Sequence, residues 1–254
     1  MIAIGLDIGS TTTKIAVMED NKLLYTEIVP TGYNVEKTWK DLFTTTRERL
    51  DLEMDKIDGI VSTGYGRNSV DIATRRVTEI MCHAAGIRYS LPGTRSIIDI
   101  GGQDSKFIQL SETGKVTDFK MNDKCAAGTG RFLEVMARAL ESNLEDFGKL
   151  SLVAEKTAKI SSMCTVFAES EVISLIAKGE ARENIIAGIH DSIANRMVSM
   201  MGRSGVVTPV AMTGGVARNE GIRAALEMKL GINIEVPATA QVNGAVGAAT
   251  LVHK

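Results

Sequence analysis

The chain has 254 residues, 44% of them hydrophobic and 24% charged, so it is long enough to bury a sizeable core as one large domain or two lobes. Its 29 basic residues nearly balance 31 acidic ones, for a net charge of −2, which indicates neither nucleic acid nor an anionic membrane as a partner. There is no apolar run of about 18 residues and no basic-then-apolar leader, and the three cysteines are too scattered for a disulfide framework, so we expect a cytoplasmic protein.

The first predicted elements are two strands joined by a polar loop. Residues 2–9 form a mostly apolar run that ends in Asp-Ile-Gly, and residues 15–18 form the next strand. The loop at 10–14 combines hydroxyl groups, backbone N–H groups and a lysine, which together suit a phosphate. Its spacing is not that of a Walker loop. Taken alone, such a loop is more often an ordinary hairpin turn.

The same pattern returns about ninety residues later in the chain. Residues 98–108 again read as an apolar run, Asp-Ile-Gly, a polar loop, a lysine and an apolar strand. Asp7 and Lys14 have the same spacing as Asp99 and Lys106. This internal repeat is more specific than either loop alone. Two such loops, facing each other, would bind the phosphates and the magnesium ion of one nucleotide from both sides.

A second pair of matching segments extends the repeat. Thr63-Gly64 and Thr213-Gly214 each follow an apolar strand and precede an Arg-Asn pair and a predicted helix. Gly214-Gly215 would let a flat ring lie against the backbone, so we expect it to contact adenosine. A strand at 232–236 and a small-residue helix at 243–249 follow. Strands that alternate with helices predict an α/β fold.

The middle of the chain is predicted to be helical and contains the cysteines. Helices are expected at 38–50, 69–87, 131–140, 145–155, 167–178 and 180–201. Asn122 or Asp123 would cap the 131–140 helix, with Cys125 near its first turn, where the helix dipole favours a thiolate. For a lone cysteine, a structural thiol is the plainer interpretation. Cys164 lies in a similar polar loop, Cys82 lies on an expected buried face, and the three histidines have no ligand spacing.

Taken together, these motifs resemble a known family. The Asp-Ile-Gly loops, the segment Cys125–Gly130 and the segment Gly214–Asn219 resemble the ATPase activators of 2-hydroxyacyl-CoA dehydratases. These are related to the nucleotide-binding subunits of benzoyl-CoA reductase, within the actin, hexokinase and Hsp70 superfamily. The resemblance implies duplicated ribonuclease H-like ATPase lobes with a nucleotide cleft between them. The first lobe would be 1–95, with the closing helix 242–254 packed back on it, and the second 96–254 would carry the cysteines.

The resemblance also implies an activity and its cofactors. Members of the family are homodimers with one four-iron, four-sulfur cluster between the subunits, which implies Cys125 and Cys164 as its ligands. A ferredoxin or flavodoxin would donate an electron, and ATP hydrolysis would drive it onto a dehydratase partner, as in anaerobic amino-acid fermentation. The cysteine count agrees with this independently, because such a cluster takes four thiolates and two chains with two cysteines each supply four.

Site residues follow from the motifs. Asp7 and Asp99 are expected at magnesium and its waters, and Gln103 either orients the attacking water, as glutamine does in small GTPases, or binds a phosphate oxygen. The expected phosphate ligands are Ser10, Thr11, Thr12, Thr13, Lys14, Gly101, Gly102 and Gln103. The residues expected near adenosine are Gly214, Gly215, Asn219 and, as a weaker candidate, Gln241.

Two other functions share these nucleotide motifs. A small-molecule kinase of the superfamily would use a catalytic aspartate near the second loop, for which Asp104 is the candidate, but it leaves Cys125 and Cys164 unexplained. A chaperone-like reactivase would use ATP to remodel a partner without a cluster. Replacing both cysteines by serine would distinguish the electron-transferring activator from the reactivase. Only electron transfer requires the thiolates, so reactivase function should survive the change.

Overall fold

The computed structural model describes residues 1–161, 164–202 and 205–253. The chain divides into two compact units. The first comprises Met1–Arg95, Leu110–Asp118 and Pro237–Lys254, and the second comprises Ser96–Gln109 and Phe119–Val236. Among the described residues, no helix is both long enough and apolar enough to cross a lipid bilayer.

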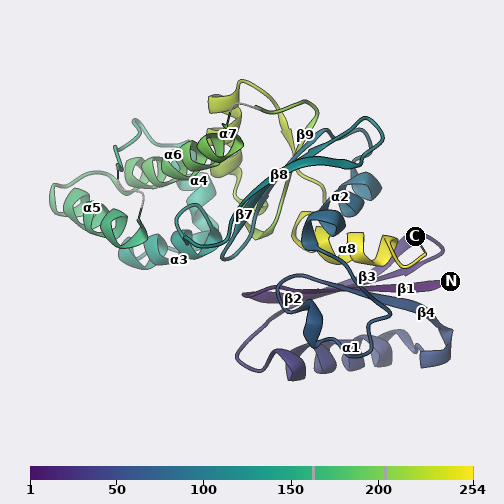
Figure 1. Ribbon diagram of the computed structural model, residues 1–254. Helices are drawn as coiled ribbons and strands as arrows, with labels where there is room; N and C mark the ends of the chain where they lie inside the picture. Colours follow the sequence, from purple (N-terminus) through teal and green to yellow (C-terminus); the bar gives the residue numbers. More distant parts are fainter. Residues whose placement is uncertain (162–163, 203–204, 254) are drawn as a thin grey trace. The chain divides into compact units, whose positions relative to one another are not determined.

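The first unit is built on a five-stranded sheet with the order β3-β2-β1-β4-β5 (Figure 1). Its strands are β1 (Ile2–Ile8), β2 (Thr12–Glu19), β3 (Lys22–Pro30), β4 (Ile57–Thr63) and β5 (Arg75–Arg76). Side chains of β1 alternate between the two faces, as the pleat of a strand requires. Ile4 and Leu6 pack in the cluster that contains Trp39 of α1 (Val35–Leu50), whereas Ala3 packs in the cluster of α8.

Helix α8 (Asn243–Thr250) lies on the sheet face opposite α1 (Figure 1). It also packs against α2 (Glu79–Ser90). The contact between α8 and β1 is between their backbones. A Cβ atom added at Gly5 of β1 would lie 1.9 Å from the carbonyl oxygen of Ala245. The small residues of α8 therefore let the end of the chain pack directly on β1.

A second sheet, most of whose residues belong to the second unit, repeats the first one. Its strands are β6 (Ser96–Ile100), β7 (Ser105–Leu110), β8 (Val116–Asn122), β9 (Val210–Thr213) and β10 (Ile234–Glu235), in the order β10-β9-β6-β7-β8. Asp7 pairs with Lys14 across an antiparallel ladder and with Thr63 across a parallel one. Asp99 pairs with Lys106 and Thr213 in the same two ways. The internal repeat predicted from the sequence is confirmed.

Helices make up the rest of the second unit. They are α3 (Gly130–Ala139), α4 (Phe147–Leu152), α5 (Thr165–Ala177), α6 (Arg182–Met201) and α7 (Glu220–Leu230). Helix α6 packs against α4 and α7. Its residues Ile185, Ile189, Ile193 and Met197 are buried at helical spacing.

Two predicted helices are wrong in extent. The helix expected at 69–87 begins only at Glu79, because residues before it form a 3-10 turn (Arg67–Ser69) and strand β5, which pairs with β4. The Thr74 hydroxyl donates to the Ile60 carbonyl and holds this edge. The helix expected at 145–155 is limited to α4, after a 3-10 turn at Leu144–Asp146. Sheet pairing therefore overrides the local helical pattern in the first case.

Candidate functional site

Asp7 lies near the end of the apolar strand β1, and its carboxylate is closely surrounded by other groups. Its carboxylate Oδ2 lies 3.2 Å from Lys14 Nζ, across the β1–β2 ladder. A Cβ atom added at Gly64 would lie 2.6 Å from Asp7 Oδ1, and one added at Gly244 would lie 2.8 Å from Oδ2. Two glycine backbones of the same unit therefore pack against this carboxylate, and only residues without a side chain fit there.

The loop after Asp7 divides its hydroxyl groups between two roles. Ser10 and Thr11 are exposed and Thr12 is partly exposed. Thr13 is buried, and its Oγ1 lies 3.0 Å from Oγ1 of Thr31. The Thr13 side chain thus braces the hairpin from inside, whereas Ser10, Thr11 and Thr12 remain accessible to a phosphate.

Asp99, the equivalent of Asp7 in the repeat, is more deeply buried than Asp7. Its Oδ1 accepts a hydrogen bond from the Thr213 hydroxyl (2.7 Å), and its Oδ2 lies 3.3 Å from Lys106 Nζ. Lys106 also pairs with Asp104 at 2.8 Å. Asp99 and Lys106 are both buried, whereas Asp104 is partly exposed and Gln103 is exposed. The accessible polar side chains of this loop are therefore those of Gln103 and Asp104.

The glycine after Thr213 packs onto the end of β6. Gly214 has φ of +88°, and a Cβ atom there would lie 2.2 Å from the carbonyl oxygen of Ile100. A side chain at this position would be strained and would also collide with the β6 backbone. The Gly214-Gly215 turn is therefore held against the strand end that carries Asp99.

The start of α3 joins the Gly101-Gly102 loop to the cysteine segment. The Gly130 amide donates to the Gly101 carbonyl at 2.9 Å, and the Arg131 amide donates to the Gly102 carbonyl at 2.8 Å. Gly130 also lies close to Val216, whose Cγ2 would be 3.6 Å from an added Cβ atom. The Gly101-Gly102 loop, the turn after Gly214 and the helix that follows Cys125 thus converge at Gly130.

Asn219 is the N-cap of α7. Its Oδ1 accepts hydrogen bonds from the Gly221 and Ile222 amides, at 3.0 and 3.1 Å. Its Nδ2 lies 3.2 Å from Nε2 of the buried His190. Because an amide nitrogen can only donate, His190 Nε2 is the acceptor. Asn219 therefore has a structural role as a cap, and its contact with adenosine stays a prediction. The weaker adenosine candidate, Gln241, lies in a 3-10 turn of the first unit, Ala240–Val242.

His190, to which the sequence assigned no role, completes this polar chain. With Nε2 accepting, Nδ1 carries the proton and donates to Ser151 Oγ at 2.9 Å. Ser151 in turn donates to the Gly148 carbonyl. The partners of His190 are 39 and 29 residues away, so no local sequence pattern could have indicated them.

Acid is expected to destabilise the protein through His190. Burial lowers the pKa of His190 from 6.5 to about 3, so between these values the unfolded chain binds a proton that the native protein does not. The free energy of unfolding should therefore fall by up to about 1.4 kcal/mol per pH unit as the pH drops through this window. Urea unfolding at several pH values measures the slope. His190→Gln should have the shallower slope, and equal slopes would contradict this assignment.

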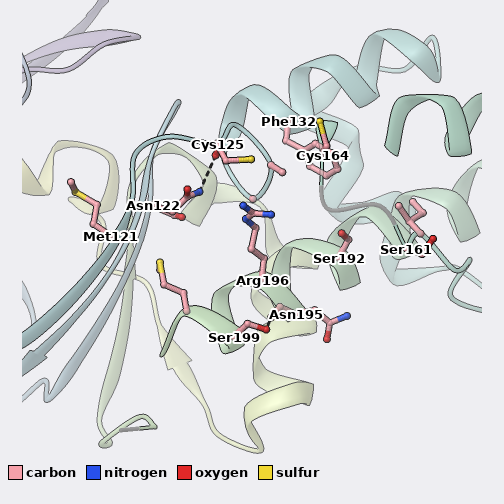
Figure 2. A pocket seen from close by; sticks show the side chains of 15 residues that line it. Met121, Asn122, Cys125, Phe132, Ser161, Cys164, Ser192, Asn195, Arg196 and Ser199 are labelled. Atoms are coloured by element: carbon pink, nitrogen blue, oxygen red, sulfur yellow. Dashed lines mark hydrogen bonds between the residues drawn. The ribbon is translucent and has the colours of Figure 1, made fainter. Parts of the chain in front are cut away.

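Cys125 and Cys164 line one cavity of about 660 Å³ in the second unit. Cys125 is partly buried and Cys164 is exposed. Figure 2 shows both residues with Phe132 and the polar side chains around them. The polar residues that line the cavity are Ser105, Asn122, Ser161, Ser192, Asn195, Arg196 and Ser199. The structure therefore brings together two cysteines that are far apart in the sequence.

The helix expected at 131–140 is present as α3, but the cap predicted at Asn122 or Asp123 is wrong. Helix α3 begins at Gly130 with Thr129 at its N-cap, and Asn122 does not cap it but donates from Nδ2 to the Cys125 carbonyl at 2.9 Å. Cys164, in contrast, is itself the N-cap residue of α5. The positive end of a helix dipole therefore lies at Cys164, where it favours negative charge, and Cys125 sits in a loop stabilised by Asn122.

The donor set of the cavity fits half of a four-iron, four-sulfur site. Such a cluster takes four thiolates. The third cysteine, Cys82, is buried in the first unit, and burial raises its pKa to about 12, so it remains a thiol. Within residues 1–161, 164–202 and 205–253, no group of three or more His, Cys, Asp or Glu side chains is placed to hold a metal ion. The two thiols of this cavity would supply two of the four ligands, and a second chain would have to supply the other two.

Comparison with known proteins places the chain among ATPases. The sequence model of the BadF/BadG/BcrA/BcrD ATPase family matches residues 4–252. The (R)-2-hydroxyglutaryl-CoA dehydratase activating ATPase of Acidaminococcus fermentans is 45% identical over 253 residues, which are 99% of this chain and 96% of that protein. The solved activator of the 2-hydroxyisocaproyl-CoA dehydratase from Clostridium difficile, with bound ADPNP, is 42% identical with a TM-score of 0.92, over 98% of this chain and 93% of that one.

A more distant likeness concerns the fold alone. A ROK family glucokinase from Streptomyces griseus has a TM-score of 0.57 at 15% identity, over 99% of both chains. Together with the duplicated sheets, this likeness confirms the predicted α/β fold of the actin and hexokinase type.

Proposed function

Since the chain belongs to the BadF/BadG/BcrA/BcrD ATPase family, we propose that it hydrolyses ATP to drive single electrons onto a 2-hydroxyacyl-CoA dehydratase. The relatives described above are named as activators of dehydratases for two different acyl-CoA substrates, at 45% and 42% identity. We therefore propose the class of 2-hydroxyacyl-CoA dehydratases as the partner, with (R)-2-hydroxyglutaryl-CoA dehydratase as the first to test.

The observation that carries the electron-transfer part is the shared cavity of Cys125 and Cys164. We propose that both thiolates bind iron there, and that two chains share one four-iron, four-sulfur cluster. When bound, such a cluster accepts and donates one electron at a time, at a potential set by its surroundings. A kinase or a cluster-free reactivase gives no reason for two cysteines in one polar cavity.

The nucleotide part rests on the duplicated loops. We propose that Asp7 holds magnesium through its waters, and that Asp99 contributes its charge from a buried position, through Lys106 and Thr213. The groups proposed to bind phosphate are Ser10, Thr11, Thr12, Lys14 and the backbone of Gly101 and Gly102. Gln103 is exposed and would orient the attacking water or bind a phosphate oxygen. Gly214, Gly215 and Gln241 are proposed for adenosine.

Coupling between the two parts has a physical basis in α3. Its first two amides donate to Gly101 and Gly102, and the loop just before the helix carries Cys125. A phosphate-dependent shift of the Gly101-Gly102 loop would therefore move the helix start and the cysteine loop with it. This connection supports the proposal that ATP hydrolysis alters the surroundings of the cysteines.

The exposed face of α5 supports a homodimer. The helix follows Cys164 directly and exposes four large apolar side chains, Val166, Phe167, Ile173 and Ile176. Exposed apolar patches of this kind mark sites of association. A second copy of the chain, packed on this face, would bring its own cysteines toward the same place.

Ile173→Glu is expected to weaken the dimer at least about 100-fold, because a carboxylate would be buried in an apolar contact. Sedimentation velocity over a range of protein concentrations measures this. Met228→Glu is the matched control, because Met228 is also a large exposed apolar residue but lies on α7. Equal dimerisation of both variants would rule out α5 as the interface.

The proposed function is tested by measuring iron and acid-labile sulfide on protein purified without oxygen, together with an EPR spectrum after reduction. About two irons per chain, from one cluster shared by two chains, are expected. Reduced ferredoxin or flavodoxin with ATP should then let the protein activate the dehydratase. Iron-free protein that hydrolyses ATP and cannot be reconstituted would overturn the proposal and favour the reactivase.

A further inference from the structure

The cysteine cavity has an uneven charge. Among the described residues that line it, Arg196 is the one with a permanently charged side chain, since an arginine stays protonated at any working pH. The other polar residues of the lining are neutral serines and asparagines. Arg196 therefore places a positive charge in the lining that the two cysteines share.

Both α6 and the cysteine loop determine where Arg196 lies. On α6, Ser192, Arg196 and Ser199 share one face at helical spacing and line the cavity, while Ile193 and Met197 point into the core. Figure 2 shows the Arg196 side chain extending from α6 toward the loop of Cys125.

Gly128 in that loop makes room for the arginine. It has φ of +88°, and a Cβ atom there would lie 2.8 Å from Cδ of Arg196. The stem of the arginine thus packs directly on the loop backbone three residues after Cys125. The guanidinium is held at the cavity by contact with both elements and not by the helix alone.

We propose that Arg196 tunes the reduction potential of the site formed by Cys125 and Cys164. This inference rests on the proposed cluster. One-electron reduction makes the site more negative by one unit and neither forms nor breaks a bond. A fixed positive charge in a partly buried cavity stabilises that extra charge. Arg196 therefore makes reduction easier, so that an ordinary low-potential donor can load the site.

The test is a potentiometric titration with dithionite, followed by EPR, of the complete protein with its cluster. Arg196→Gln should lower the ratio of reduced to oxidised cluster about tenfold at a fixed ambient potential, which equals about 59 mV for one electron. Arg196→Lys, which keeps the charge, should stay within about threefold of the unmodified protein. Iron per chain should be the same in all variants.

Arg182→Gln is the matched control. Arg182 is exposed on the same helix, fourteen positions earlier, about 21 Å along the axis and beyond a Debye length at ordinary salt. The Arg182→Gln variant should therefore leave the ratio of reduced to oxidised cluster unchanged. An unchanged ratio in Arg196→Gln, or loss of iron from that variant, would overturn the tuning role while the proposed function stands. Absence of iron from the unmodified protein would instead overturn the proposed function and this inference with it.

Discussion

Cys125→Ser and Cys164→Ser are each expected to reduce bound iron from about two atoms per chain to nearly none. Each substitution would remove two of the four thiolates of the proposed shared site, one from each chain, and a serine hydroxyl is a poor ligand for iron–sulfur clusters. Activation of the dehydratase should disappear with the iron. Iron and sulfide determination on anaerobically purified protein measures the first effect, and the dehydratase assay measures the second.

Cys82→Ala is the matched control for the two cysteine variants. Cys82 is buried among Val61 and Ala248, so its replacement removes a small apolar group but no ligand and should leave the iron content unchanged. ATP hydrolysis should persist in all three variants, because the nucleotide loops contain no cysteine. Iron retained in Cys125→Ser would show that the cluster ligands lie elsewhere, and loss of ATP hydrolysis would indicate misfolding.

Asp7→Asn is expected to lower kcat for ATP at least about 100-fold, because the carboxylate proposed for magnesium supplies several kcal/mol of transition-state stabilisation. Its stability should fall by about 1.5 kcal/mol, since Asp7 is buried but its bond with Lys14 is only part-buried. Asparagine keeps the shape of the side chain and removes the charge. ATP turnover at saturating Mg–ATP and urea unfolding measure the two quantities.

Asp99→Asn should behave differently although it is the same substitution in the repeated motif. Asp99 and Lys106 are each only 2% exposed at their side chains, against 11% and 15% for Asp7 and Lys14. Removing the charge of Asp99 weakens the pairing of a buried lysine, so we expect about 3 kcal/mol of destabilisation, in addition to slower hydrolysis. Asp104 limits this cost because it also pairs with Lys106. Equal stability of the two variants would contradict the distinction between the aspartates.

Much of the fold followed from local patterns. The hairpin at β1–β2 and its copy at β6–β7 were predictable because strand alternation and the Asp-to-Lys spacing are properties of short segments. The same holds for α8, whose small residues predict the close packing that Gly5 and Ala245 show. In contrast, the helix cap predicted at Asn122 or Asp123 was wrong, because the loop from Asn122 to Thr129 is held by hydrogen bonds that helical periodicity does not encode.

The candidate site shows the same division. The family resemblance, the duplicated loops and the two loop cysteines could be read from the chain alone, since they depend on residue type and on spacing along it. Three features required the folded structure: Asp99 is more deeply buried than Asp7, Asn219 and His190 belong to one hydrogen-bonded chain, and Arg196 lines the cavity of both cysteines. The reason is physical: burial and the electrostatic surroundings of a side chain are set by segments that are distant in sequence, and these meet only when the chain has folded.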